Sequence, residues 1–153
     1  MQRQGIPGGT VAIAAVVLLT WSVGLFGCGK SKAREALSAK LEQRVRSASE
    51  TGGTFHMAEV TDFDWDALYV FTPYVGEELI KKRLGMDWSG AREVYDTECL
   101  LVFLKGNEVV MDLGFPRHQG DFGNLQKDAI PRDDARFTVP QGQKQLEHAV
   151  EAP

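Results

Sequence analysis

The sequence predicts an α+β domain, with a mainly antiparallel sheet of four or five strands, helices packed on one face of it, and a signal peptide in front. Three patterns support this architecture. Segments with a strand pattern outnumber strong helical segments, the firmest pair of consecutive strands forms a hairpin, and an uncharged N-terminal stretch differs from all that follows. Strands joined by a hairpin are antiparallel, which favours the α+β class over a parallel α/β sheet.

The first thirty residues have the composition of a secretory signal. Arg3 is the one charged side chain before Lys30, and residues 11–19 are nine consecutive apolar residues. A positive start, an apolar centre and small residues ahead of a cleavage site are typical of a bacterial signal peptide. We therefore expect this segment to direct the chain out of the cytoplasm.

The apolar run ends in Leu25-Phe26-Gly27-Cys28. This stretch resembles the lipobox of bacterial lipoproteins, although Phe26 departs from the small or aliphatic residue usual at that position. The resemblance implies cleavage before Cys28 and a diacylglycerol on the Cys28 thiol, and the new amino group can also be acylated. It divides the chain into a removed signal peptide (1–27), a lipidated N-terminus with a short tether (28–32) and a single globular domain (33–153).

Lipidation at Cys28 would make membrane lipid a partner of the domain, on the extracytoplasmic side of a bacterial membrane. Each buried lipid CH₂ contributes about 0.8 kcal/mol, so two or three chains hold a domain durably where one does not. Two alternatives stay open. Residues 10–26 are long enough for an uncleaved anchor, and Lys30, Lys32 and Arg34 after it favour a cytoplasmic domain. Cys28 could also be an ordinary residue in a plain secretory signal.

Net charge and cysteine content narrow the functions open to the domain. Without residues 1–27 the chain has 126 residues, 16 basic and 21 acidic side chains, and a formal net charge of −5. That mild acidity argues against a nucleic-acid partner, which usually binds a basic patch. With Cys28 lipidated, Cys99 has no partner for a disulfide. We expect Cys99 to be a buried small side chain in a strand.

Two main helices are predicted. Apolar residues four apart, with charged residues on the remaining face, predict a peripheral helix over 31–49 that ends at Gly52-Gly53. A second helix is predicted over 75–84, where acidic residues near the start and basic residues near the end suit the helix dipole. Gly85 supplies its C-terminal stop. Weaker patterns predict a helical turn over 91–95 and a C-terminal helix over 141–149.

The strands follow from alternation and from turn residues. Residues 68–71 are apolar at every position, which suits a central strand, and Pro73 ends it because proline cannot donate to a ladder. Gly106-Asn107 separates two apolar arms and predicts an exposed two-residue turn. The stretch 114–136, rich in glycine, proline and aspartate, is predicted to be a long loop. The predicted strands cover residues 54–60, 68–71, 98–105, 108–113 and 137–139.

The segment from Phe63 to Tyr74 has the spacing F-x-W-D-x-x-Y-x-F-x-P-Y. This spacing is similar to that of small, uncharacterised bacterial lipoproteins, which pair an FDWD segment and a PY helix start with a later apolar hairpin. The resemblance implies a lipoprotein of α+β fold and adds no mechanism. It covers most of residues 54–122 and also takes in Leu101-Val102-Phe103, Val109-Val110, Phe115-Pro116-Arg117 and Asp121-Phe122.

Three acidic residues alternate at Asp62, Asp64 and Asp66, as at the start of a calcium loop. An EF-hand needs glycine at its sixth position and glutamate at its twelfth, and those positions here are Ala67 and Pro73. The EF-hand pattern therefore fails, and a cation flanked by the three acids is the remaining metal hypothesis. We interpret Asp62 and Asp64 as solvated turn residues and expect Asp66 to cap or brace that same turn.

Aromatic side chains are dense in the same segment. Trp65, Tyr69 and Phe71 share the period-two spacing of a strand, where aromatic residues are more often core than binding surface. With Tyr74 and Trp88 they could otherwise form an aromatic binding surface. We expect the segment to hold the fold together.

His118 and Asp121 are the candidate catalytic residues, and they lie beside Arg117 in the predicted long loop. A histidine and an aspartate can form an acid/base pair or donate to a metal, and a hydrolase could use them with Asp64 or Asp66. No further ligands lie at metal-site spacing, and no serine lies in a G-x-S-x-G sequence. We therefore predict no catalytic, metal or cofactor-binding residue.

The leading prediction is a membrane-anchored, extracytoplasmic lipoprotein that acts as a non-catalytic interaction or structural module of the cell envelope. Its predicted partners are membrane lipid, through acylated Cys28, and an envelope protein. One alternative is an extracytoplasmic hydrolase with a His118/Asp121 site. Another is a small inhibitor or immunity-type lipoprotein.

Overall fold

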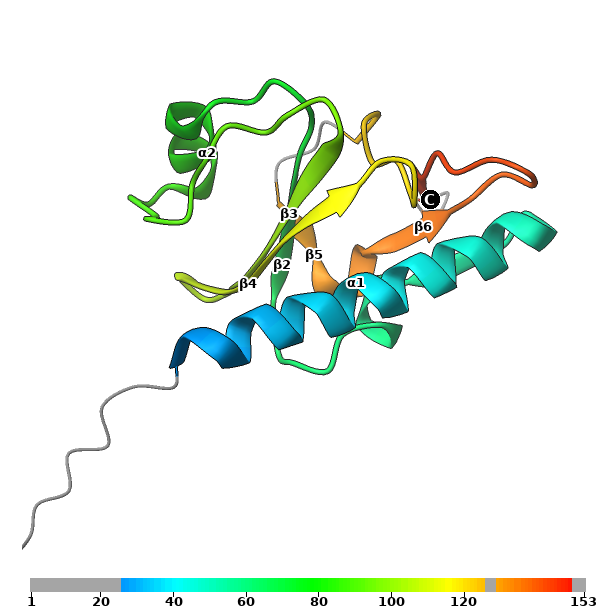
Figure 1. Cartoon of the computed structure of the whole chain (residues 1–153), viewed down its shortest axis with the longest axis horizontal. Helices are drawn as coiled ribbons and strands as arrows, with labels where there is room; N and C mark the ends of the chain where they lie inside the picture. The colour runs from blue at the N-terminus through cyan, green and yellow to red at the C-terminus, as the bar shows by residue number, and fades with distance from the viewer. Residues whose placement is uncertain (1–25, 126–128, 150–153) are drawn as a thin grey trace, which may run out of the picture.

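The computed structural model of the chain describes residues 26–125 and 129–149, with side chains from Gly29 onward (Figure 1). The predicted signal peptide, the alternative anchor over 10–26, Leu25 and the side chain of Cys28 lie outside these described residues. They stay predictions.

The described part of the chain contains both helices and strands, which confirms the predicted α+β class. In chain order the elements are α1 (Phe26–Thr51), β1 (Thr54–His56), a 3₁₀ turn (Met57–Glu59), β2 (Ala67–Phe71), α2 (Glu77–Leu84), β3 (Glu98–Lys105), β4 (Glu108–Pro116), β5 (Ile130–Pro131), a second 3₁₀ turn (Arg132–Asp134), β6 (Arg136–Thr138) and β7 (Glu147–His148).

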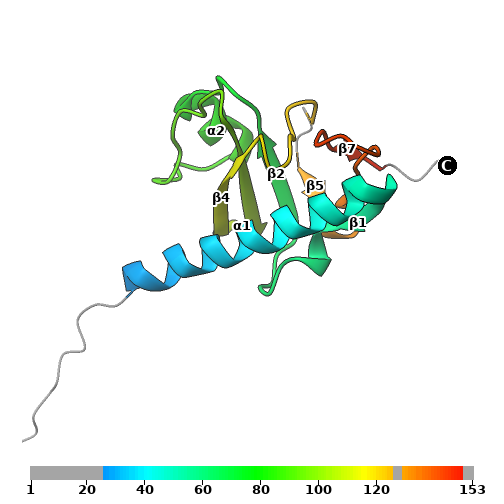
Figure 2. The same ribbon diagram turned by 45° about the vertical axis from the view of Figure 1, so that its right-hand side comes forward.

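The strands form two antiparallel sheets rather than one (Figures 1 and 2). A four-stranded sheet has the order β4-β3-β2-β5 and matches the predicted size, whereas a three-stranded sheet has the order β1-β6-β7. In the second sheet Thr54 pairs with Thr138, eighty-four residues further on, and their hydroxyls lie 2.8 Å apart. Such a pairing leaves no local pattern in the sequence, so the second sheet was not predicted.

The two helices cover opposite faces of the four-stranded sheet, whereas the sequence predicted helices on one face. α1 packs on the face that carries Leu101 and Phe103 of β3, and α2 packs on the face that carries Leu100 and Val102. β3 is buried on both faces from Cys99 to Leu104. Both faces are apolar, so each must be covered, and one helix covers each.

α1 extends the predicted helix at both ends and forms a long arm of the molecule. Its buried residues follow the predicted stripe: Leu37, Leu41, Val45 and Ala48. Residues 29–32 are exposed, and the N-terminal turns of α1 reach past the edge of the four-stranded sheet (Figures 1 and 2). The chain therefore leaves position 28 as a helix.

β2 is central, as its four apolar residues predict, because it pairs with β3 on one side and with β5 on the other. α2 begins at Glu77, two residues later than predicted, and ends at Gly85, whose φ is +69°. Glu77 and Lys81, one turn apart on this helix, form an ion pair at 2.6 Å. The predictions of β2 and α2 are correct because the sequence patterns behind them depend on neighbouring residues.

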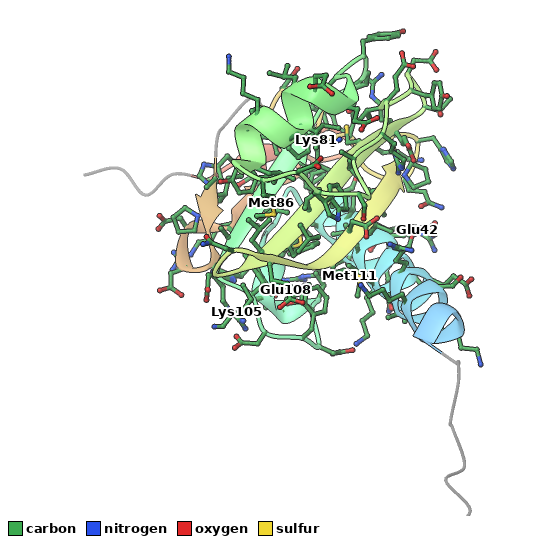
Figure 3. All side chains as sticks on the ribbon, turned by 90° about the vertical axis from the view of Figure 1, so that its left-hand side faces the viewer. Glu42, Lys81, Met86, Lys105, Glu108 and Met111 are labelled. Carbon is green, nitrogen blue, oxygen red and sulfur yellow. The ribbon has the colours of Figure 1, made fainter. Side chains whose placement is uncertain are left out.

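The β3–β4 hairpin has the predicted exposed two-residue turn. Lys105 pairs with Glu108 across it, and Gly106 has a φ of +56°, which glycine adopts without strain. The Gly106 amide donates to Asp66 Oδ2 at 2.8 Å, and Lys105 Nζ lies 2.8 Å from Asp66 Oδ1. Asp66 thus braces the hairpin turn, forty residues away, and not its own turn as expected. Figure 3 shows Lys105 and Glu108 at this end of the hairpin, with Met111 further along β4.

The strand predicted over 54–60 and the helix predicted over 141–149 are wrong in part or in whole. β1 stops at His56 and the chain turns, because the Met57 amide donates to the Ala135 carbonyl at 2.8 Å. The C-terminal segment forms a turn and then β7, which pairs with β6. In both places a contact with a distant segment outweighs a weak local propensity.

The helical turn predicted over 91–95 is also wrong. This segment is irregular, and the Val94 amide donates to the Val75 carbonyl at 3.0 Å. The Tyr74 amide donates to the Val94 carbonyl at 2.7 Å. The two bonds hold the segment after β2 against the segment before β3.

Candidate functional site

The N-terminal end of α1 carries the predicted lipid attachment site. α1 begins at Phe26 and so includes position 28. Lys30 and Lys32 are exposed, whereas Arg34 is held on the sheet by a hydrogen bond from its Nε to the Asp112 carbonyl at 3.0 Å. Two of the three basic residues behind Cys28 are therefore free to face a membrane surface. Within residues 26–125 and 129–149, no helix has both the length and the hydropathy needed to cross a membrane.

The alternating acids do not converge on a common point. Asp62 pairs with Lys40 of α1, Asp64 Oδ2 lies 2.9 Å from Lys105 Nζ, and Asp66 also pairs with Lys105. The amine of Lys105 thus occupies the space between two of the acids. Among the residues that the structure describes, no three histidine, cysteine, aspartate or glutamate side chains are grouped to hold a metal ion.

His118 and Asp121 lie close in sequence but in different surroundings. His118 is exposed and lines an open cleft of about 300 Å³. Asp121 is bound by Arg117, whose Nε and Nη2 donate to its two carboxylate oxygens at 2.9 and 2.7 Å. Asp121 Oδ1 also accepts the Gly123 amide at 2.8 Å. The structure therefore does not bring the two residues together as an acid/base pair.

Arg117 and Asp121 instead fix the loop after β4. Arg117 Nη1 donates to the Asp96 carbonyl at 3.0 Å, and the Arg117 amide donates to the Thr97 carbonyl at 3.0 Å. The hydrogen bond with Asp121 is the largest of the effects that raise the pKa of Arg117, with a smaller one from Tyr74. Arg117 in turn holds the pKa of Asp121 below its usual range. The four-residue spacing of this pair was visible in the sequence, where it was interpreted as part of a possible catalytic site.

The same loop approaches α1 closely. A Cβ at Gly120 would lie 2.9 Å from the Phe115 ring and 3.2 Å from the Val45 side chain, so only glycine fits there without a shift of its neighbours. Gly120 is itself buried. The Arg117–Asp121 pair and this contact together give the loop a fixed place on the core.

Cys99 lies beneath this loop and is fully buried, as predicted. Its thiol faces Asp121 Oδ1 at 3.9 Å. Burial raises the pKa of the Cys99 thiol to about 11, so the thiol is protonated at neutral pH. A protonated, buried thiol is a poor nucleophile, which agrees with the structural role expected for Cys99.

The cleft beside His118 lies between the C-terminal half of α1 and two loops. Arg46 and Glu50 of α1 line it with Lys144, and the Lys144 amine donates to the His118 carbonyl at 2.5 Å. Cations and anions are mixed along its walls. The cleft thus has charges of both signs, and Asp121 is not among the residues that line it.

The aromatic residues separate into buried and exposed groups. Trp65 is fully buried, with its Nε1 donating to Thr61 Oγ1 at 2.9 Å, and Phe71 is fully buried as well. Tyr69 is half-buried against the core under α2. Tyr74 is 78% exposed, and Tyr95, which the sequence analysis did not single out, is 63% exposed. The predicted structural role is confirmed for Trp65, Tyr69 and Phe71, but not for Tyr74.

Searches against protein-family models, curated proteins and solved structures find no match for this chain.

Proposed function

We propose that the protein is an extracytoplasmic lipoprotein, anchored to a bacterial membrane through acylated Cys28, whose folded domain is a non-catalytic interaction module. The observation that carries the proposal is the stretch Leu25-Phe26-Gly27-Cys28 at the end of an uncharged N-terminal run, directly before a folded domain. Cleavage before Cys28 would place the lipidated residue at the first turn of α1. The lipid and the domain would then be joined by a helix.

Two features of α1 support this arrangement. The exposed amines of Lys30 and Lys32 lie within four residues of Cys28, where each would add about 1 kcal/mol of attraction to an anionic membrane surface. Helix-forming residues continue without glycine or proline from Lys30 to Thr51, so the arm is stiff. A stiff arm would hold the domain close to the bilayer and limit the surfaces that it presents outward.

The chemistry of the described residues supports a binding role over an enzymatic one. Asp121 is bound by Arg117, the alternating acids are paired with lysines, and the thiol of Cys99 is buried. A catalytic site needs several groups that converge on one reacting atom. These three kinds of group are instead held in separate structural contacts.

The experiment is metabolic labelling with radioactive palmitate in a bacterial host, followed by membrane fractionation. We expect the wild-type chain to be labelled and to sediment with membranes, and Cys28→Ala to lose the label and accumulate at the size of the precursor. Cys99→Ala is the matched control, since it removes the other cysteine and should keep the label. Undiminished labelling of Cys28→Ala would refute the proposal.

A further inference from the structure

One end of the four-stranded sheet exposes two tyrosine rings. The large apolar side chains that are exposed within the described residues are Tyr74, Leu79 and Tyr95. Tyr74 follows β2 and Tyr95 precedes β3, and the hydrogen bonds between their segments join residues 74 and 75 to Val94. The two rings are therefore carried by adjacent backbone segments at the same end of the sheet.

Tyr74 is held in a backbone conformation that does not suit it. Its φ is +68°, in the left-handed region, and it is the one residue other than glycine with a positive φ among those described. Pro73 before it and the positive φ match a type II turn, in which glycine is the usual residue at this position. Strained backbone positions cluster at binding and active sites. The side chain of Tyr74 is 78% exposed, so burial in the core does not explain this conformation.

The surroundings of the two rings are acidic. Glu93 and Asp96 flank Tyr95 and are exposed. Arg117 lies at the same end, where it binds the Asp96 carbonyl, but its charge is balanced by Asp121. The three segments that meet here, 74–78, 92–98 and 117–121, carry six acidic side chains. Three of these are in ion pairs with Lys81, Arg92 and Arg117, which leaves Glu78, Glu93 and Asp96. A bound partner would therefore meet negative charge beside the tyrosines.

We propose that Tyr74, Glu93, Tyr95 and Asp96 form a docking surface, the tyrosine surface, for an arginine- or lysine-bearing segment of a protein partner. Tyrosine rings attract cations through their faces, and arginine does this most often. Tyrosine is also enriched in the buried centres of protein interfaces. Adjacent carboxylates add a charge partner for the same cation. This docking surface rests on the proposed function as an interaction module, and it specifies the chemistry of the partner.

The position of the tyrosine surface agrees with a domain anchored at Cys28. In Figures 1 and 2 the loops after β2 and before β3 lie at the top of the molecule, whereas α1 crosses its lower part and starts at the lower left. The sheet lies between them. A lipid at the N-terminal end of α1 would thus leave the tyrosine surface open to a partner.

The test measures peptide binding to the full chain in neutral detergent micelles by isothermal titration calorimetry. The probes are three acetylated hexapeptides, (Arg-Ala)₃, (Lys-Ala)₃ and (Glu-Ala)₃. We expect the arginine peptide to bind most tightly and the glutamate peptide not to bind. Tyr95→Ala and Tyr74→Gly should each weaken binding of the arginine peptide about two- to fivefold, from the lost cation–π contact.

The melting temperature of Tyr74→Gly and two further variants separate recognition from folding and from anchoring. Tyr74→Gly relieves the left-handed strain, so its melting temperature should stay the same or rise while binding falls. Leu79→Ala is the control, since it removes an exposed apolar side chain outside the tyrosine surface. It should bind the arginine peptide as the wild type does. Cys28→Ala should bind the peptide equally well, because the tyrosine surface does not involve the lipid. Equal binding of the arginine peptide by the wild type, Tyr95→Ala and Tyr74→Gly, or no preference over the glutamate peptide, would overturn the proposal.

Discussion

The α1 face and the α2 face of the four-stranded sheet are covered in different ways. Of the described residues, 22 are buried in the core under α1 and eight in the core under α2. The larger core continues into the three-stranded sheet, where Phe122 packs edge-on against Phe115 and Phe137 with ring centroids 6.0 and 5.5 Å apart. The smaller core is bordered by the exposed Tyr74, Leu79 and Tyr95.

This difference separates stability from recognition within one small domain. The core under α1 joins α1, both sheets and the loop after β4, so a change there disturbs all of these elements at once. The core under α2 joins one short helix and its connections to two strands. An element with few buried contacts can expose rings and keep a strained turn at low cost to the rest. We therefore expect the two faces to respond differently to substitution.

The largest effect should come from Phe103→Ala. This ring is fully buried on the α1 face and packs edge-on against Phe63 and Trp65, with centroids 5.3 and 5.2 Å away. Removing it leaves a cavity, which should lower the free energy of unfolding by about 3–5 kcal/mol. Urea unfolding of a chain that starts at Gly29 measures the loss. A loss under 1 kcal/mol would contradict the central place given to this core.

Ile80→Ala tests the other face. Ile80 is fully buried under α2, but in the smaller cluster. We expect a loss of about 2–3 kcal/mol, at the low end for such a truncation, because fewer buried side chains lose contacts. The same unfolding experiment gives the value. A larger loss for Ile80→Ala than for Phe103→Ala would reverse the comparison.

A smaller effect is expected for Asp121→Asn, which removes the charge that Arg117 binds. The variant should lose about 1–2 kcal/mol at pH 7, as for a hydrogen bond with a charged group. The pKa of Asp121 is lowered in the folded state, so its contribution is present above the unfolded pKa of about 3.9 and is lost as the pH falls through the folded value. Between pH 7 and pH 3 the wild type should therefore lose more stability than the variant. Parallel pH profiles for the two proteins would contradict this role of Asp121.

The smallest effect is expected for Asp64→Ala. Its side chain is 73% exposed, and its partners Lys105 and Arg132 are ions at the surface. Exposed ion pairs contribute little to stability, so the free energy of unfolding should change by no more than about 0.5 kcal/mol. Thermal melts at low and at physiological salt measure it. Collapse of this variant would show that the alternating acids hold an ion or a structural element after all.

Local signals in the sequence were sufficient for several elements. The apolar stripe of α1, the all-apolar β2, the charge order of α2 and the Gly106-Asn107 turn each gave the right element. These predictions succeed because periodicity, caps and turn residues act within a few positions of the chain. Asp66 was expected to brace its own turn, but it braces the Gly106-Asn107 turn, which is distant in the sequence.

For the candidate site, the sequence showed the residue types but not their neighbours. His118 and Asp121 are three positions apart, which suggested an acid/base pair. In the structure the guanidinium of Arg117 binds Asp121, and His118 lines a cleft. Tyr95 carried no pattern of its own, since its exposure depends on the hydrogen bonds between Val94 and the Tyr74–Val75 segment. Such contacts are decided by packing between distant parts of the chain.

The sequence by itself determined the class of the fold, the central strand, the hairpin and the placing of Cys28 at the end of an apolar N-terminal run. Only the tertiary structure decided that there are two sheets, that the helices cover opposite faces, and that two tyrosines share one end. The physical reason is the range of the interactions. Helix and turn preferences are set by neighbouring residues, whereas strand partners and exposed surfaces are set by which apolar faces the whole chain can bury together.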